Sequence, residues 1–519
     1  MANNQYVNKV QYGSNTLIDL TSDTAVASDV ASGKYFHLAT GQRVQGTATG
    51  GGTTAGTVTQ DANGYLILDD DAPAGPTLIT KSITANGTYN ASSDSADGYS
   101  SVTVNVSGGG GGGDMSDPIR FFDYDGTLVA SYSSVPASLP SVPTHTGLTS
   151  GTWNYTLQQV QTQFNAMGTC DVGANYSTVS GATEIDIELQ EGRLHPYLSL
   201  AVNGTVEIDW GDSSTPDTST GTSLTTRKSD IYHEYAAAGK YTIKISKTSG
   251  TGYALYCTST YTLLNKNSST QNANRVYSNC VQSVRVGANC TIGNYAFYYC
   301  YSLASASIPS GVTSIGTSAF YYCYSLASVS IPSTVTSIGT NVFNGCYSLA
   351  SVSIPSTVTS IGSGAFQYCY SLLSVSIPSG VTSIDTNAFS YCYSIASLTI
   401  PNTVTFINNS AFASCYSLAS VSISSDVTSI GSSVFSNCYS LVSITIPNGI
   451  TTIPTKIFNN CYGMAEYHFT RTTSVPTLDN ADAFSNIQSD CVIYVPSSKL
   501  NDYKTAENWA TYSSYMVGE

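Results

Sequence analysis

The chain has 519 residues, of which only 10% are charged, and its 18 Lys and Arg against 33 Asp and Glu give a formal net charge of -15. A surface this poor in positive charge is unsuited to nucleic acid, which requires clustered Lys and Arg. No apolar run approaches the roughly 18 residues of a membrane span, so neither nucleic-acid binding nor membrane insertion is expected, and the length allows three or four domains.

The N-terminal part is predicted to hold two small modules and a linker. Residues 1–49 form the first, which ends before three glycines and which the resemblance given below makes an attachment module, and residues 50–107 form a β-hairpin module with Asn63-Gly64 at a turn. Residues 108–116 contain six consecutive glycines and are predicted to be a flexible linker. The first residues, MANNQYVNKVQYGSN, lack the apolar core of a signal peptide, so ordinary secretion is not expected.

Three phrases in this part carry a resemblance: NTLIDLTSDT, SGKYFHLATGQRVQGT and ITANGTYNASSDSADGYSSVTVNV. Their style resembles tail and other virion proteins of phages that infect gut Firmicutes. The resemblance covers about 110 residues and implies that this part docks on other virion proteins while the distal part is presented outward.

Residues 117–250 are predicted to be a middle α+β region that opens with a motif. The run from Ile119 to Val129, IRFFDYDGTLV, resembles the first motif of the haloacid dehalogenase phosphatases, in which the residue at Asp123 would be the nucleophile and that at Asp125 the general acid/base, with Mg²⁺. The alternative is a β-hairpin that turns at Asp125-Gly126. The prolines that follow, where the enzyme requires a helix, favour the hairpin.

Two further elements are expected in this region. Leu157, Val160 and Phe164 at spacings of three and four residues predict an amphipathic helix over 155–166. The runs VEIDWGD, from Val206, and HEYAAAGKYTI, from His233, resemble the signatures of PKD-type β-sandwiches, here at about 200–247, although Ser213 stands where those domains have Gly. Asp209 and Asp212 allow a cation site, but turn-fixing by the two carboxylates is the favoured interpretation.

Residues 251–464 contain a repeat of 23 residues. A typical unit reads CYSLASVSIPSTVTSIGTNVFNG, and a fixed period of this length indicates a solenoid whose coils stack on one continuous core. The repeated cysteines are Cys300, Cys323, Cys346, Cys369, Cys392, Cys415, Cys438 and Cys461.

The columns of the repeat predict the shape of one coil. Ser328 to Ile331 alternates as a strand, with Val329 and Ile331 inward and the serines outward. The Phe-x-x-Cys-x-x-Leu spacing predicts a helical or 3₁₀ turn on the other side of the coil. The Cys column points into the core, and small buried thiols are favoured over disulfides or metal ligands.

The repeat C-x-S-L-x-S-V-x-I-P-x-x-V-T-S-I-G-x-x-A-F-x-x-C resembles the BspA-type leucine-rich repeat. The resemblance implies a solenoid used for adhesion and surface recognition rather than catalysis. A tyrosine follows every repeated cysteine, and this column with the outward Ser and Thr ladders is the candidate recognition face; the alternative is that the tyrosines only pack on one another. The tyrosines are Tyr301, Tyr324, Tyr347, Tyr370, Tyr393, Tyr416, Tyr439 and Tyr462.

After Cys461 the period fails, and residues 465–519 are predicted to cap the open end of the solenoid, with Leu500, Tyr503 and Trp509 available to cover it. The fold class expected is therefore mainly β: small β modules, a PKD-like β-sandwich and a C-terminal leucine-rich-repeat solenoid of 23-residue coils.

The favoured function is a phage tail-associated structural protein and adhesin of the virion, made in the host cytoplasm. Its partners would be other virion proteins and a host-surface glycan or protein, and a homo-oligomer is expected. The alternative is an adhesin on a bacterial cell surface, and the remote alternative a phosphatase at Asp123. No catalytic residue, cofactor or metal site is expected, since His37, His145, His195, His233 and His468 are scattered through separate parts of the chain.

Overall fold

The structure is a computed structural model that describes residues 117–228, 231–258, 263–264 and 278–519, and before them the backbone of eight short strands. The chain divides into two compact units, Met1–Gly108 and Gly109–Glu519, within the run of glycines. The predicted modules at 1–49 and 50–107 and the linker at 108–116 lie otherwise outside the described residues. The strands of the first unit pair antiparallel as β1 (Val10–Tyr12) with β2 (Asn15–Ile18), β3 (Tyr35–His37) with β4 (Arg43–Gln45), β5 (Thr57–Gln60) with β6 (Leu66–Asp69), and β7 (Gly87–Asn90) with β8 (Ser101–Val104).

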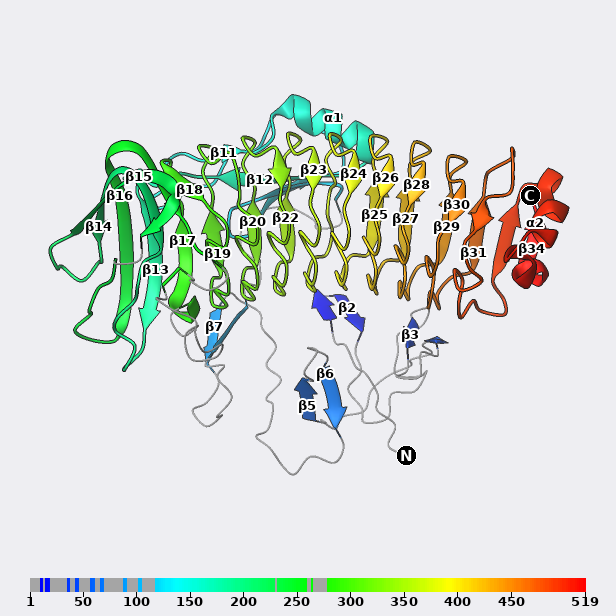
Figure 1. The fold of residues 1–519 in the computed structure, drawn as a ribbon, viewed down its shortest axis with the longest axis horizontal. Coiled ribbons are helices and arrows are strands. Elements are labelled where there is room, and N and C mark those ends of the chain that lie inside the picture. The colour runs from blue at the N-terminus through cyan, green and yellow to red at the C-terminus, as the bar shows by residue number, and fades with distance from the viewer. Residues whose placement is uncertain are drawn as a thin grey trace. The chain divides into compact units, whose positions relative to one another are not determined.

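The repeats of the second unit form a solenoid with parallel strands along two of its sides (Figure 1). On one side the strands pair in register, for example Ser328 with Ser351 and Ser397 with Ser420, so that each coil lies directly over the previous one. We call this side the long-strand face. Its strands are β19 (Ser305–Ser307), β20 (Ser328–Ser330), β22 (Ser351–Ser353), β25 (Ser397–Ile400), β27 (Ser420–Ile423), β29 (Ser443–Ile446) and β31 (Glu466–Phe469).

A second side carries strands of two residues, which we call the short-strand face. Its strands are β21 (Ser337–Ile338), β23 (Ser360–Ile361), β24 (Ser383–Ile384), β26 (Phe406–Ile407), β28 (Ser429–Ile430), β30 (Thr452–Ile453) and β32 (Thr477–Leu478). Most coils thus alternate a longer and a shorter strand, because the Ser-Val-Ser-Ile and Thr-Ser-Ile runs both place an apolar side chain inward and a polar one outward.

The turn that contains Phe-x-x-Cys is not helical, contrary to the prediction. Hydrogen bonds of the i to i+3 type do form, as from the Cys323 amide to the Phe320 carbonyl at 3.2 Å. However, two residues of the turn have a left-handed backbone. One directly precedes the cysteine, as Tyr322 does with φ 58°, and the other lies five residues before the cysteine, as Ser318 does with φ 53°. Left-handed residues interrupt a helix and cost about 1–2 kcal/mol each outside glycine. The reversed backbone directs the Tyr322 amide to the Asn344 carbonyl of the next coil at 2.8 Å, which offsets that cost.

The core runs without a break through the solenoid. The phenylalanine rings stack from coil to coil with centroids 5.0–5.9 Å apart between Phe297 and Phe458, and they are fully buried. The prediction that the Cys column points inward is confirmed, since all eight cysteines are at most 2% exposed. Each thiol from Cys323 to Cys461 also donates to the carbonyl of the phenylalanine 26 residues earlier, as from Cys323 to Phe297 at 3.2 Å.

A large sheet closes the N-terminal end of the solenoid. It runs in the order β15, β14, β16, β13, β17, β19, and β18 pairs with β16. Because these described strands form one sheet whose core continues into the coils, the predicted PKD-like sandwich of two sheets is not confirmed. The strands are β13 (Thr183–Leu189), β14 (Leu200–Asp209), β15 (Asp217–Lys228), β16 (Gly239–Leu255), β17 (Val281–Arg285) and β18 (Cys290–Ile292).

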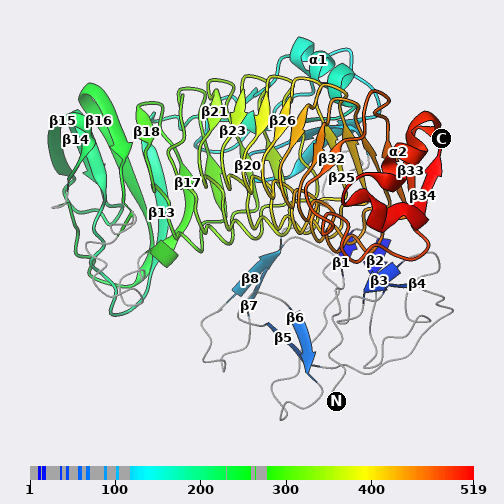
Figure 2. The same ribbon diagram turned by 45° about the vertical axis from the view of Figure 1, so that its right-hand side comes forward.

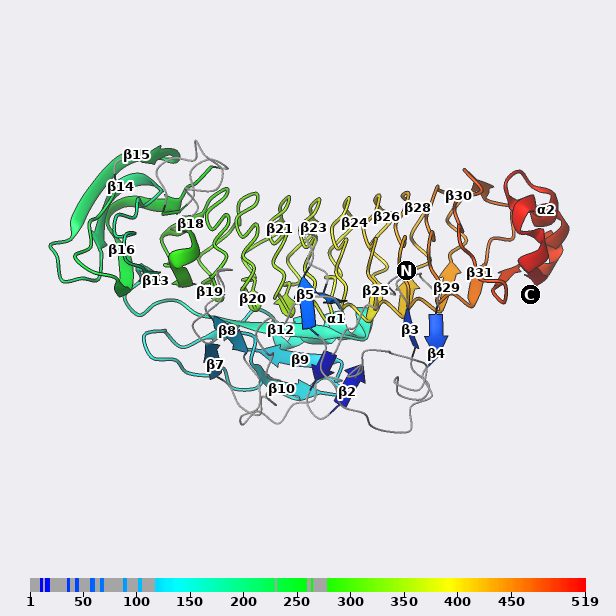
Figure 3. The same cartoon turned by 90° about the horizontal axis from the view of Figure 1, so that it is seen from below.

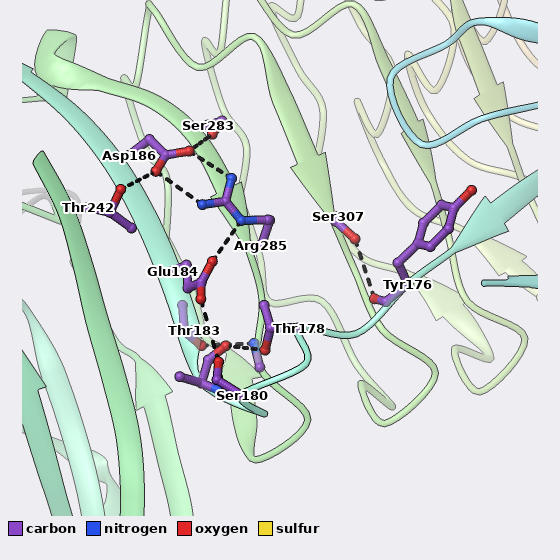
Figure 4. A network of polar contacts seen from close by, with 12 residues as sticks. Tyr176, Thr178, Ser180, Thr183, Glu184, Asp186, Thr242, Ser283, Arg285 and Ser307 are labelled. Atoms are coloured by element: carbon purple, nitrogen blue, oxygen red, sulfur yellow. Dashed lines mark hydrogen bonds and ion pairs between the residues drawn. The ribbon is translucent and has the colours of Figure 1, made fainter. Parts of the chain in front are cut away.

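An ion-pair network joins this sheet to the first coil (Figure 4). Arg285, on β17, contacts Glu184 at 2.9 Å and Asp186 at 2.7 Å, both on the neighbouring strand β13. Beside it, the Ser307 hydroxyl of the next coil donates to the Tyr176 carbonyl at 3.3 Å. The ion pairs therefore join β13 to β17, the strand that pairs parallel with β19 of the next coil, and the Ser307 contact joins that coil to residues 117–178.

Residues 117–178 form a small α+β module against the side of the solenoid (Figure 3). Its sheet runs in the order β10 (Leu128–Tyr132), β9 (Ile119–Phe122), β12 (Cys170–Asn175), β11 (Thr152–Trp153). The predicted helix is present as α1 (Leu157–Met167), which begins with a capping box between Thr156 and Gln159.

The C-terminal end is covered by a small cap of strands and helices (Figure 2). It consists of β33 (Val492–Val495), the 3₁₀ turn Ser497–Lys499, α2 (Leu500–Thr505), the 3₁₀ segment Trp509–Tyr515 and β34 (Met516–Gly518). Tyr503 and Trp509 are fully buried, and the Trp509 indole donates to the Pro476 carbonyl at 2.8 Å. These rings cover the last phenylalanines, as the sequence suggested.

Candidate functional site

The eight tyrosines that follow the repeated cysteines form one ordered stack. Ring centroids are 4.4–4.6 Å apart from Tyr301 to Tyr439, with interplanar angles of 0–18°, and the last pair, with Tyr462, opens to 5.5 Å and 31°. Every tyrosine of this column is half-buried. Because each ring face lies against its neighbours in the stack, the column presents mainly ring edges and hydroxyls.

The hydroxyls of the column interact with one another. Tyr347 shares hydrogen bonds with Tyr324 and Tyr370. Burial first, and then the nearby tyrosines, raises the pKa of Tyr324. Burial and then Tyr322 raise the pKa of Tyr347, although its hydrogen bonds with Tyr324 and Tyr370 act in the opposite direction. The column is therefore uncharged at neutral pH and offers a row of hydroxyl groups at the spacing of the coils.

A second set of tyrosines widens the column, and the sequence analysis missed it. Tyr299, Tyr322, Tyr368 and Tyr391 precede their cysteines, and each ring lies 5.5–6.2 Å from the column tyrosine of its own coil. In the coil of Cys346 the residue before the cysteine is Gly345. A Cβ at Gly345 would lie 1.8 Å from the Tyr322 ring, so the glycine leaves space for that ring. The recurrence of Tyr before Cys was visible in the repeat, but its left-handed backbone, which turns these rings toward the column, was not.

The outward serines of the long-strand face do not all reach solvent, which corrects the prediction for Ser328 and Ser330. These residues are only 4% and 3% exposed, because the module at 117–178 covers the first coils. Its Asn154 amide donates to the Ile331 carbonyl at 3.0 Å and to the Ser353 hydroxyl at 2.9 Å. The Tyr155 hydroxyl donates to the Ile354 carbonyl at 2.6 Å.

The module ends near the coil of Ser376. The Gln163 side-chain amide donates to the Ser376 hydroxyl and to the Ile377 carbonyl, both at 3.0 Å. Beyond this point Ser397, Ser420 and Ser443 are exposed. Before this point Ser351 and Ser374 are half-buried, so the predicted Ser ladder is fully exposed on the long-strand face only from the coil of Ser397 onward.

The short-strand face keeps its hydroxyls exposed along the whole array. Its column of threonines is solvent-exposed in every coil, and the Thr428 hydroxyl lies 3.3 Å from the Thr405 carbonyl of the previous coil. This part of the predicted hydroxyl ladders is therefore accessible. The column comprises Thr313, Thr336, Thr359, Thr382, Thr405, Thr428 and Thr451.

The motif around Asp123 forms a β-hairpin, with β9 and β10 antiparallel and Gly126 at φ 88° in the turn. Asp123 is 6% exposed, accepts a hydrogen bond from the Tyr176 hydroxyl at 2.8 Å and lies 2.7 Å from the His145 ring. Asp125 accepts from the Thr127 amide at 3.0 Å, inside the turn. Both carboxylates therefore order the loops of the module.

Asp209 and Asp212 also fix a turn. The Gly211 amide donates to Asp209 at 2.9 Å, and the Ser214 amide donates to Asp212 at 3.1 Å. Burial alone would raise the pKa of Asp212, but hydrogen bonds with Ser214 and His233 lower it to about 2. His233 stacks on Trp210 with centroids 5.0 Å apart, so the two halves of the sequence signature do meet.

The described residues show no cluster of three or more His, Cys, Asp or Glu suited to a metal ion. Among these same residues, no helix has the length and apolar character needed to cross a membrane. Of the five histidines, His37 lies outside the residues described with side chains, His195 lies 3.7 Å from Glu234, and His468 lies 3.2 Å from Glu466 and 3.1 Å from Glu519.

Comparison with known proteins identifies the repeats. The family model described as the BspA type leucine rich repeat region matches residues 290–419 and 382–505, with six copies. No curated protein matches the chain. The matched region extends past residue 464, where the sequence analysis ended the solenoid.

Three solved structures are similar in part. A leucine rich cell surface protein from Faecalibacterium prausnitzii is 26% identical over 42% of this chain and 80% of its own, with a TM-score of 0.25. A leucine rich repeat protein of T. pallidum is 25% identical over 39% and 82%, with a TM-score of 0.26. The pneumococcal vaccine antigen PcpA is 16% identical over 46% and 77%, with a TM-score of 0.24.

The in-register coils, the stacked phenylalanines and the family match agree on one assignment. Residues 290–505 match a BspA-type leucine-rich repeat region, and the repeats within them form a β-solenoid whose coils have 23 residues from Cys300 to Cys461.

Proposed function

We propose that the protein is an adhesin-like recognition protein that acts by binding rather than catalysis. The observation that carries this proposal is the tyrosine column, an ordered and uncharged stack of eight half-buried rings on a rigid solenoid. Only Asp385, Asp426 and Lys456 are charged between Cys300 and Cys461. Such a surface suits a neutral partner, either a glycan or a flat protein surface, since tyrosines carry much of the binding energy at interfaces.

We propose a bacterial cell surface as its setting. The BspA-type repeat region supports this choice over the virion, and the name of the Faecalibacterium protein places that protein at a cell surface. The phage-like phrases before Gly108 are the argument for a virion, with the N-terminal part docked on other virion proteins. The genes on either side of the gene for this protein distinguish the two settings. Virion genes on both sides would favour the phage tail protein.

The tyrosine column is tested with two triple variants of the full chain. Replacing Tyr347, Tyr370 and Tyr393 by Phe removes three hydroxyls and keeps the stacked rings, so the melting temperature stays within a few degrees while binding to the target cells weakens about tenfold or more. Replacing the same residues by Ser also removes the ring contacts, each of which contributes about 0.5–1.5 kcal/mol, so this variant melts at a lower temperature.

The matched control changes three threonines of the short-strand face, Thr359, Thr382 and Thr405, to Val. These side chains are exposed, and their loss leaves the tyrosine column intact. If the Phe variant binds as the unmodified protein does, the tyrosines serve packing alone and the recognition proposal fails.

A phosphatase remains the second candidate, because the DYDGT motif is complete. We propose that Asp123 has no catalytic role, since both of its carboxylate oxygens are engaged by Tyr176 and His145. Magnesium-dependent hydrolysis of a phosphate monoester that disappears in Asp123→Asn, with the melting temperature unchanged, would establish the opposite.

A further inference from the structure

A notch lies where the module at 117–178 ends against the long-strand face. Its walls come from both parts: Arg120, Thr169 and Asp171 from the module, and Ser374, Ser397 and Thr399 from the solenoid. The cavity measures about 50 Å³. On this measure a site for one water molecule needs about 10–15 Å³, so the notch has room for a group of a few heavy atoms, such as a hydroxymethyl.

The polar wall of the notch is charge-balanced. Arg120 donates from Nε to Asp171 Oδ1 and from Nη2 to Oδ2, both at 2.8 Å, and Nη2 also donates to the Ser374 hydroxyl at 2.5 Å. The two charged side chains are only 11% and 5% exposed. The pair is held rigidly, and it offers oriented hydrogen-bonding groups without a net charge.

The floor of the notch continues into an open lane of the long-strand face. β25, β27 and β29 lie side by side there, with Ser397, Ser420 and Ser443 exposed. Val421 and Ile423 are only partly buried, so the lane combines hydroxyl groups with small apolar patches. No residue of these three strands is charged.

The lane begins where the sheet of the long-strand face is interrupted, between β22 and β25; we call this interruption the step. Leu373–Ser379 forms no strand, and β22 and β25 belong to separate sheets. Ser330, Ser353 and Ser376, on the module side of the step, are at most 6% exposed. The notch thus closes one end of an otherwise open surface, and a ligand that lies along the coils meets it end-on.

We propose that the notch and the lane form a binding site for a neutral oligosaccharide, separate from the tyrosine column. A hydroxymethyl or hydroxyl group of the terminal sugar enters the notch and pairs with Arg120, Asp171 and Thr169. The sugar rings lie along β25, β27 and β29, where hydroxyl groups meet Ser397 and Ser420 and the C–H faces meet Val421. A neutral ligand fits because Arg120 and Asp171, the only charged side chains among the described residues that line the notch, pair with each other.

The test measures binding of the full chain to an array of immobilised neutral and acidic oligosaccharides. Ser420→Arg fills the lane with a long charged side chain, and Thr428→Arg is the matched control on the short-strand face. We expect neutral oligosaccharides to bind the unmodified protein and the control equally, and to bind Ser420→Arg at least about tenfold more weakly.

Two further variants make the outcome specific. Thr169→Val removes a hydroxyl from the notch at nearly constant size, so it weakens the same sugars without lowering the melting temperature. The triple Phe variant of Tyr347, Tyr370 and Tyr393 reports on the tyrosine column, so any sugar that this variant also loses is assigned to the column. Only sugars that Ser420→Arg and Thr169→Val weaken, and that the Phe variant does not, count as ligands of the notch and the lane.

The proposal is overturned if neutral oligosaccharides do not bind, if they bind Ser420→Arg as well as the unmodified protein, or if only acidic sugars bind. Self-association that Ser420→Arg abolishes, in the absence of sugar binding, would instead identify the lane as a contact between copies of the chain.

Discussion

The cysteine column shows how one side chain serves both packing and hydrogen bonding. Each thiol is buried among phenylalanines, yet Cys369 donates to the Phe343 carbonyl of the previous coil at 3.3 Å. The sequence alone suggested a small apolar side chain without a polar partner. Because the thiol links adjacent coils, its replacement affects both the core and the stacking of the coils.

Cys369→Ser is expected to lower the free energy of unfolding by about 1–2 kcal/mol. The hydroxyl still has the Phe343 carbonyl as an acceptor, but the shorter side chain lengthens that hydrogen bond and leaves a small gap. Denaturant unfolding measures the loss. The exposed Ser348→Ala is the control and stays within about 0.5 kcal/mol of the unmodified protein. A loss above about 3 kcal/mol would mean that the hydroxyl is buried without a partner.

At the scale of elements, the same repeat unit meets different surroundings. The backbone of the module approaches the long-strand face so closely that a Cβ at Gly173 would lie 2.3 Å from the Ser330 hydroxyl and 2.8 Å from the Ser353 Cβ. A Cβ at Gly126 would lie 2.8 Å from the Ser328 Cβ. The close packing of the module on the coils therefore depends on glycine in the module, because a larger residue there would clash with the serines of the coils.

Gly173→Ala is expected to loosen the module from the solenoid, because the added methyl group has no room beside β20 and β22. Hydrogen exchange would show faster exchange in residues 119–122 and 170–175, with the amides of the later coils unchanged. Gly239→Ala, where the nearest atom to an added Cβ is 3.5 Å away, serves as the control and should leave the module in place. Unchanged exchange in Gly173→Ala would show that the module is held without this close approach.

At the scale of the whole molecule, the thiols make stability depend on pH. Burial raises the pKa of Cys415, Cys461 and Cys491 to about 12, and that of Cys280 and Cys290 to about 11. In the unfolded chain the same thiols ionise near their ordinary pKa of about 8.5. The folded state therefore keeps its full stability below that pH and loses it as the pH rises toward 11, because only the unfolded state gains thiolates.

The melting temperature is expected to be level up to about pH 8 and to fall between pH 9 and 11. Alkylation with iodoacetamide at pH 8 provides a second measurement, in which the native protein reacts slowly and the denatured protein is labelled at its cysteines. Rapid labelling of the native protein, or recovery of a Cys323–Cys346 disulfide under non-reducing conditions, would contradict this account.

The sequence by itself determined the solenoid, because every coil must place the same inward side chains at the same step for one core to continue through the stack. The Phe, Cys and Leu columns, the first strand of each coil and the Tyr column follow from that periodicity. The end cap followed from Tyr503 and Trp509, which only an open last coil needs. The left-handed turns did not follow, because their residues vary from Tyr to Ser, Asn and Lys.

Only the tertiary structure decided which repeats are accessible. The sequence Ser-Val-Ser occurs both at 351–353 and at 420–422, yet Ser353 is buried and Ser422 is exposed. The difference comes from the module at 117–178, which covers Ser353 and whose Asp171 carbonyl, 182 residues earlier in the chain, accepts a hydrogen bond from the Ser353 hydroxyl. A contact across that distance leaves no trace in a 23-residue period, and it is this contact that separates the covered coils from the open lane.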